Sequence, residues 1–153
     1  MDLRPELLPP HVPPRRLAAL SREIERVAEL VLDGAGDEAV AAFNAATGHR
    51  YGPLDFVEYD GLRSLEEFAR EAARPAWPRV PDVTRDELVE IVRRVAADPA
   101  SPDCDYYLLL LAANVPHPRA RDLVLGSDLG PESGADAAGR VVDALLSYRA
   151  ISL

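Results

Sequence analysis

The sequence predicts an all-α fold in two helical halves joined by a proline-rich connector. Apolar residues recur at three- and four-residue steps in several segments, and no segment alternates apolar and polar residues for long enough to predict a strand. Three prolines without periodicity interrupt the chain between residues 75 and 83. We therefore expect a helical N-terminal domain over 1–74, a connector over 75–83 and a helical domain over 84–153, the last with four helices.

Four helices are expected in the first half. The first follows Pro13-Pro14 and ends at Gly34, because a glycine often ends a helix in the left-handed conformation. Its apolar face consists of Leu17, Leu20, Ile24, Val27 and Val31. A second helix is expected over 37–47, one or two helical turns over 53–59, and a fourth helix from Ser64, whose hydroxyl can cap it with Glu67 three residues later.

The connector and the second half follow from similar signals. We expect Trp77 to pack the connector against the rest of the chain. Thr84 and Glu87 repeat the capping pattern, and Ser101-Pro102 are expected to start a helix that runs to about Asn114. A short helix over 119–125 and a last helix before Tyr148 complete this half. Its expected core is Leu88, Ile91, Val92, Val95, Tyr107, Leu111, Leu123, Val142, Leu145 and Leu146.

Composition limits the classes of function. Twenty-six acidic and seventeen basic residues give a formal charge of −9, so the long-range field repels nucleic acid and favours a basic protein as partner. All seventeen basic residues are arginine, which excludes lysine-dependent chemistry such as a phosphate-loop lysine. Cys104 is the single cysteine. With no signal peptide and no apolar run that could span a bilayer, we expect a cytoplasmic protein with no membrane partner.

Catalytic and metal sites are not predicted. His11, His49 and His117 are more than thirty residues apart and match no metal-ligand spacing, and Cys104 has two acidic neighbours that disfavour its thiolate. His117, between two prolines, could act as a catalytic base or could fix a tight turn. We therefore expect no cofactor, no metal and no catalytic residue, and a hydrolase that uses His117 or His49 is a remote alternative.

One ordered pattern covers residues 84–150. A capped helix from Thr84 is followed by His117-Pro118, by Asp122-Leu123-Val124 and, after a loop, by a helical segment from Val141 whose pattern continues through Tyr148 to Ala150. This pattern resembles the immunity proteins of nuclease bacteriocins, the colicin and pyocin family. The resemblance implies a four-helix inhibitor that is not an enzyme and that binds a toxic nuclease beside its active site. The binding surface would combine the short third helix, as a hot spot, with the second helix, which sets specificity.

Partner-binding residues also follow from the resemblance. His117 and Pro118 would form the structural turn, and Leu125 and Gly126 stand where the family has two tyrosines. The positions that would contact the toxin are Asp105, Leu108, Leu109, Ala112, Arg121, Asp122 and Leu125. In the first half, Asp55, Glu58 and Tyr59 fit a similar pattern, so this half is either a degenerate second copy over 14–74 or a helical extension of its own kind.

The function that these observations favour is inhibition of a cognate basic nuclease toxin by protein–protein binding. The negative charge would accelerate such an association. An acidic helical adaptor, or a nucleic-acid mimic that regulates a basic protein without a toxin, is the alternative from another class.

Overall fold

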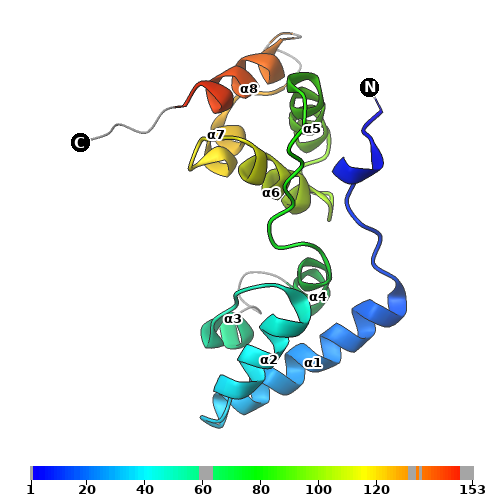
Figure 1. Cartoon of the computed structure of the whole chain (residues 1–153), viewed down its shortest axis with the longest axis vertical. Coiled ribbons are helices and arrows are strands. Elements are labelled where there is room, and N and C mark those ends of the chain that lie inside the picture. Colours follow the sequence, from blue (N-terminus) through cyan, green and yellow to red (C-terminus); the bar gives the residue numbers. More distant parts are fainter. Residues whose placement is uncertain (1, 59–63, 131–133, 135, 149–153) are drawn as a thin grey trace, which may run out of the picture. The chain divides into compact units, whose positions relative to one another are not determined.

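Every regular element in the described part of the chain is helical, which confirms the all-α fold class. The computed structural model describes residues 2–58, 64–130, 134 and 136–148. Contacts divide the chain into an N-terminal unit, Pro10–Ala76, and a C-terminal unit, Met1–Pro9 with Trp77–Leu153. The elements are a 3-10 helix η1 (Pro5–Leu7) and the α-helices, which are labelled in Figure 1: α1 (Pro14–Leu32), α2 (Asp37–Thr47), α3 (Pro53–Glu58), α4 (Leu65–Ala73), α5 (Arg85–Ala97), α6 (Cys104–Asn114), α7 (Ala120–Gly126) and α8 (Ala137–Ser147).

The N-terminal segment does not belong to the domain predicted for residues 1–74. Leu3 and Leu7 are buried, at 6% and 0% exposure, in the same apolar core as Leu88 and Ile91 of α5. Arg4 strengthens this contact, since its Nη1 lies 2.9 Å from Asp82 Oδ2. The predicted boundary is therefore wrong for the first nine residues, because two buried leucines in so short a segment carry no periodic signal.

The N-terminal unit is built around α1, which packs against α2, α3 and α4. Phe56 and Phe68 are fully buried in its core, and the ring of Phe43 meets that of Phe56 edge to face at 5.2 Å. The turn between α1 and α2 requires glycine, because a Cβ at Gly36 would lie 2.8 Å from the Val31 Cα. As predicted, a capping serine starts α4: Ser64 Oγ accepts the Glu67 backbone N–H at 3.1 Å.

In the C-terminal unit, α5 packs against α6 and α8, and α7 packs against α6 and α8. The capping box predicted at Thr84 and Glu87 is present. Eight of the ten expected core residues are buried, namely Leu88, Ile91, Val92, Val95, Tyr107, Leu111, Val142 and Leu145. Leu123 is half-buried, and Leu146 is 40% exposed. The prediction for Leu146 is wrong because this residue lies in the last turn of α8, at the edge of the buried face formed by Val142 and Leu145.

The connector is held by a side chain that the sequence did not indicate. Asn114, at the end of α6, accepts the Val80 backbone N–H at 2.8 Å and donates to the Pro78 carbonyl at 3.0 Å. Trp77 is 59% exposed, so the prediction that it packs the connector is wrong. The predicted start of α6 at Ser101-Pro102 is also early. The Ser101 carbonyl accepts the Cys104 N–H in a separate turn, and the helix begins at Cys104.

In each unit the first α-helix is the longest and the third is the shortest, but the two short third helices pack differently. The main contacts of α3 are with the long first helix α1, whereas α7 packs against α6 and α8. The possible duplication of the two halves therefore has no counterpart in how the short helices pack. Among the described residues, no helix combines the length and apolar character needed to cross a membrane.

Candidate partner-binding surface

The turn before α7 is fixed by His117. α6 ends at Asn114, and Val115 is already extended, which leads the chain into the Pro-His-Pro segment. The Arg119 backbone N–H donates to His117 Nδ1 at 3.0 Å. Because Nδ1 accepts this hydrogen bond, the proton of the neutral ring lies on Nε2. The structure thus gives His117 the role of a turn residue, one of the two roles that the sequence left open.

Two buried residues orient α7. Ala120 and Val124, one helical turn apart, are each 2% exposed and pack into the core. As a result the opposite face of α7 carries Arg121, Asp122 and Leu125 on the surface. Leu125 is 52% exposed, so α7 presents a large apolar side chain beside acidic and basic groups.

The helix α6 contributes a neighbouring strip of surface. Asp105 is exposed, and Leu109 and Ala112 are half-buried at helical spacing from it. Arg121 Nη1 lies 3.1 Å from Asp105 Oδ1, which links α7 to α6 across this strip. We call Asp105, Leu109, Ala112, Arg121, Asp122 and Leu125 the α6–α7 surface.

One predicted contact residue is not on this surface. Leu108 is 2% exposed and belongs to the core of the C-terminal unit, because α6 packs against α5 as well as α7. It cannot touch a partner without repacking that core, so the prediction of a contact role for Leu108 is wrong.

Cys104, at the start of α6, is buried. Burial and the nearby Asp105 raise the pKa of its thiol, although Arg121 acts in the opposite direction. The thiol form is therefore favoured, which does not suit a nucleophile. Among the described residues, no three histidine, cysteine, aspartate or glutamate side chains come together in a way that could hold a metal ion.

The pattern predicted in the first half lies on α3. Asp55 and Glu58 are exposed, and Leu54 beside them is 63% exposed. Asp55 Oδ2 accepts the Gly52 backbone N–H at 2.8 Å, which closes the turn at the start of α3. Tyr59 lies outside the described residues. α3 thus presents an exposed leucine next to two carboxylates, and we call Leu54, Asp55 and Glu58 the α3 surface.

His49, the other candidate for a catalytic base, is buried in the N-terminal unit at 8% exposure. Its Nε2 lies 2.7 Å from the Arg74 carbonyl, and its ring stacks on Tyr51 with centroids 5.0 Å apart. A carbonyl only accepts, so Nε2 carries the proton. His49 therefore connects the segment after α2 to the end of α4 through this hydrogen bond. Because its ring is buried, a substrate could not reach it.

Comparisons with protein-family models, with curated proteins and with solved structures find no match for this chain.

The distribution of charged residues bears on the kind of partner that each surface suits. Residues 10–76 hold twelve acidic residues and eight arginines, so the acidic excess is not confined to the C-terminal unit. On the α6–α7 surface, by contrast, Arg121 offsets Asp105, and exposed Arg119 lies close to Asp122 in the chain.

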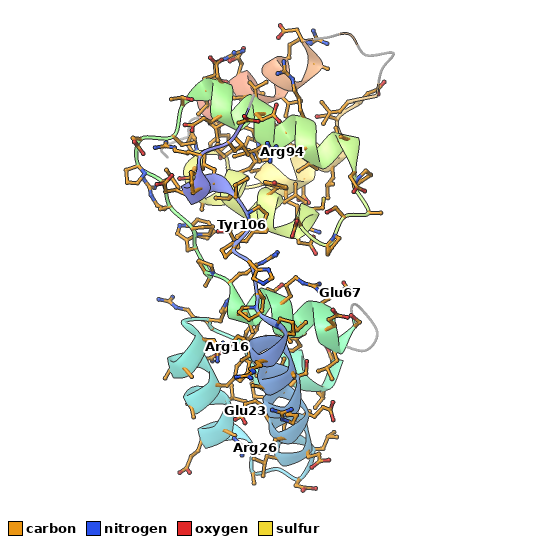
Figure 2. The ribbon with its side chains drawn as sticks, turned by 90° about the vertical axis from the view of Figure 1, so that its right-hand side faces the viewer. Arg16, Glu23, Arg26, Glu67, Arg94 and Tyr106 are labelled. Atoms are coloured by element: carbon orange, nitrogen blue, oxygen red, sulfur yellow. The ribbon has the colours of Figure 1, made fainter. Side chains whose placement is uncertain are left out.

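The acidic faces of α1 and α4 are partly neutralised by arginines of the same helix. Glu23 and Arg26 pair on α1 (Figure 2), and Arg70 Nη2 lies 2.9 Å from Glu66 Oε1 on α4. The hydrogen bond from Arg26 lowers the pKa of Glu23. Exposed pairs at such spacing contribute little to stability, and they leave less unpaired negative charge on these helices than the sequence suggests.

Proposed function

We propose that this chain is an immunity-type inhibitor that binds a basic nuclease toxin through the α6–α7 surface. The observation that carries the proposal is the arrangement around His117: a histidine-anchored turn introduces a short helix whose buried side is Ala120 and Val124 and whose exposed side is Arg121, Asp122 and Leu125. In the nuclease immunity proteins that the sequence resembles, the hot spot lies on the short third helix, and α7 is the corresponding helix in this proposal. An inhibitor that acts by binding needs no catalytic residue, metal or cofactor, and this proposal includes none.

The physical properties of the surface support such a role. It combines one exposed apolar side chain, Leu125, with charged groups of both signs, which suits a specific interface with a polar rim. The formal charge of −9 would steer a basic partner toward the protein before the contacts form. The cognate toxin is therefore expected to be basic, with an apolar contact patch of its own.

The test uses the neighbouring reading frames of this gene. We expect one of them to end in a basic nuclease domain, and this domain is produced alone and mixed with the whole chain. Cleavage of plasmid DNA should stop at one equivalent of the chain, and the association rate should fall as salt rises. The absence of a basic nuclease beside the gene, or full cleavage in the presence of excess chain, would refute the proposal.

The Asp122→Asn and Leu125→Ala variants locate the surface. Each should weaken inhibition at least tenfold, and circular dichroism should show an unchanged helical fold because both side chains are exposed. The matched control is Leu32→Ala on α1, where an even more exposed leucine, 75%, lies outside the α6–α7 surface. Equal effects of Leu125→Ala and Leu32→Ala would contradict the assignment of this surface.

A further inference from the structure

We propose that Tyr148, at the end of α8, is an aromatic anchor of the same interface. This inference rests on the proposed function and adds a residue that is not among the contact positions expected from the sequence. The rings of Tyr148 and His117 lie with their centroids 4.8 Å apart and their planes at 54°. Thus the residue that fixes the turn before α7 also contacts the residue that follows α8.

The position of Tyr148 makes its ring accessible. Tyr148 follows Ser147, the last residue of α8, and is the C-cap of that helix with extended backbone angles. Its side chain keeps 36% exposure although one side contacts His117. Because the ring contacts His117 in the turn before α7, and α7 also packs against α8, the ring lies next to the start of α7.

The α6–α7 surface has no exposed aromatic side chain of its own. On α7 the residues are Ala-Arg-Asp-Leu-Val-Leu-Gly, and on α6 both Tyr106 and Tyr107 are buried. Binding energy in protein interfaces is concentrated in a few residues, and tyrosine is among the most frequent of them. An exposed tyrosine against the turn that leads into α7 is therefore the side chain best suited to add an anchor.

The contact with His117 prepares the ring for binding. His117 is itself held by the hydrogen bond from the Arg119 backbone, so Tyr148 packs on a fixed partner. A side chain that is already ordered loses little conformational entropy when a complex forms. The face of an exposed tyrosine ring attracts a cation, and a basic partner offers arginine and lysine side chains for this contact. We infer that a cationic side chain of the toxin lies over the Tyr148 ring.

The first experiment compares substitutions at Tyr148 with a control on the same helix. Binding to the basic nuclease domain encoded beside this gene is measured for Tyr148→Ala, Tyr148→Phe and Tyr148→Leu. We expect at least tenfold weaker binding for Tyr148→Ala, binding within threefold of wild type for Tyr148→Phe, and a loss for Tyr148→Leu close to that for Tyr148→Ala. Leu146→Ala is the matched control, because Leu146 is similarly exposed, at 40%, but lies within α8, at the edge of the buried face formed by Val142 and Leu145.

The second experiment distinguishes direct contact from an effect through His117. Cys104 is buried and its thiol pKa is raised, so a cysteine introduced at the surface is the one that reacts with an alkylating reagent. The nuclease domain should slow alkylation of the Tyr148→Cys variant at least tenfold and should leave the Leu146→Cys variant unchanged.

The outcomes separate this inference from the proposed function. If the wild-type chain does not bind the nuclease domain, both are wrong. If the wild-type chain binds but Tyr148→Ala binds within threefold of it, only the Tyr148 anchor is wrong. In the last case Tyr148→Ala weakens binding, but a saturating concentration of the nuclease domain does not protect the cysteine of the Tyr148→Cys variant from alkylation. The ring then acts only by positioning His117, and the anchor is again refuted.

Discussion

Arg4 Nε lies 2.9 Å from Glu87 Oε2, although 83 residues separate the two side chains in sequence. Glu87 also accepts the Thr84 backbone N–H at 2.9 Å in the capping box of α5. Burial acts to raise the pKa of Glu87, but the hydrogen bonds from Thr84 and Arg4 outweigh it, so this pKa lies below its ordinary value. One carboxylate thus starts α5 and holds the N-terminal segment on the C-terminal unit.

Leu7→Ala should destabilise the C-terminal unit by about 2 to 5 kcal/mol, because it removes a fully buried side chain and leaves a cavity. The next residue provides the control: Leu8 is 37% exposed, and Leu8→Ala should change stability by less than about 0.5 kcal/mol. Urea unfolding followed by circular dichroism measures both. Equal stability of the Leu7→Ala variant and the wild type would mean that the N-terminal segment does not pack on this unit.

Acid should weaken the link between α5 and α8. Arg85 Nε lies 2.7 Å from Asp143 Oδ1, and this hydrogen bond lowers the Asp143 pKa below its ordinary value of 3.8. A carboxylate with a lowered pKa in the folded state stabilises the fold above its unfolded-state pKa, and this contribution is lost as the pH falls below about 4. Wild type should therefore lose more thermal stability between pH 5 and pH 2.5 than Asp143→Asn does.

The measurement is the melting temperature at each pH and at low salt, because the pair is exposed and salt screens it. Glu25→Gln is the control, since Glu25 is an exposed carboxylate of α1, for which no hydrogen bond or ion pair is found among the described residues. If Asp143→Asn and wild type lose the same stability on acidification, the ion pair makes no contribution in solution.

Local patterns predicted the helices, but contacts between distant residues could not be predicted. The Thr84 capping box and the periodic leucines act within one or two helical turns, so the sequence contains their whole cause. Leu3, Leu7 and Asn114 act on residues far along the chain, and nothing in their neighbourhood signals this. Leu108 shows the same limit for the candidate surface: on a helix as apolar as α6, periodicity does not separate the buried side from the exposed one.

His49→Ala should destabilise the N-terminal unit by about 1 to 3 kcal/mol, because it removes the hydrogen bond of the buried His49 ring to the Arg74 carbonyl and the stack on Tyr51. Thermal unfolding checks this prediction, and inhibition of the nuclease domain at a temperature where both proteins are folded should be unchanged. His11→Ala is the control for a histidine that is exposed. Unchanged stability would show that the buried hydrogen bond is replaced by another contact.

Two surfaces, one on each unit, compete for the role of the inhibitory face, and a pair of matched charge substitutions separates them. The α3 surface is the more acidic, with Asp55, Glu58 and the exposed Leu54, whereas the α6–α7 surface follows the His117 turn and has its charges partly balanced. Long-range attraction alone would favour the first. We expect the second to carry the binding energy, because a hot spot depends on desolvated contacts more than on net charge.

Asp122→Asn and Asp55→Asn each remove one exposed charge and keep the shape of the side chain, and asparagine at position 55 can still accept the Gly52 N–H. Asp122→Asn should weaken binding of the basic nuclease domain at least tenfold, mainly through faster dissociation. Asp55→Asn should stay within threefold and should lower only the association rate, by an amount that vanishes as salt screens the charge. Kinetics at two salt concentrations measure both effects. If Asp55→Asn speeds dissociation tenfold while Asp122→Asn leaves it unchanged, the inhibitory face lies on α3, because a rim charge alters the encounter and only a desolvated contact alters the lifetime of the complex.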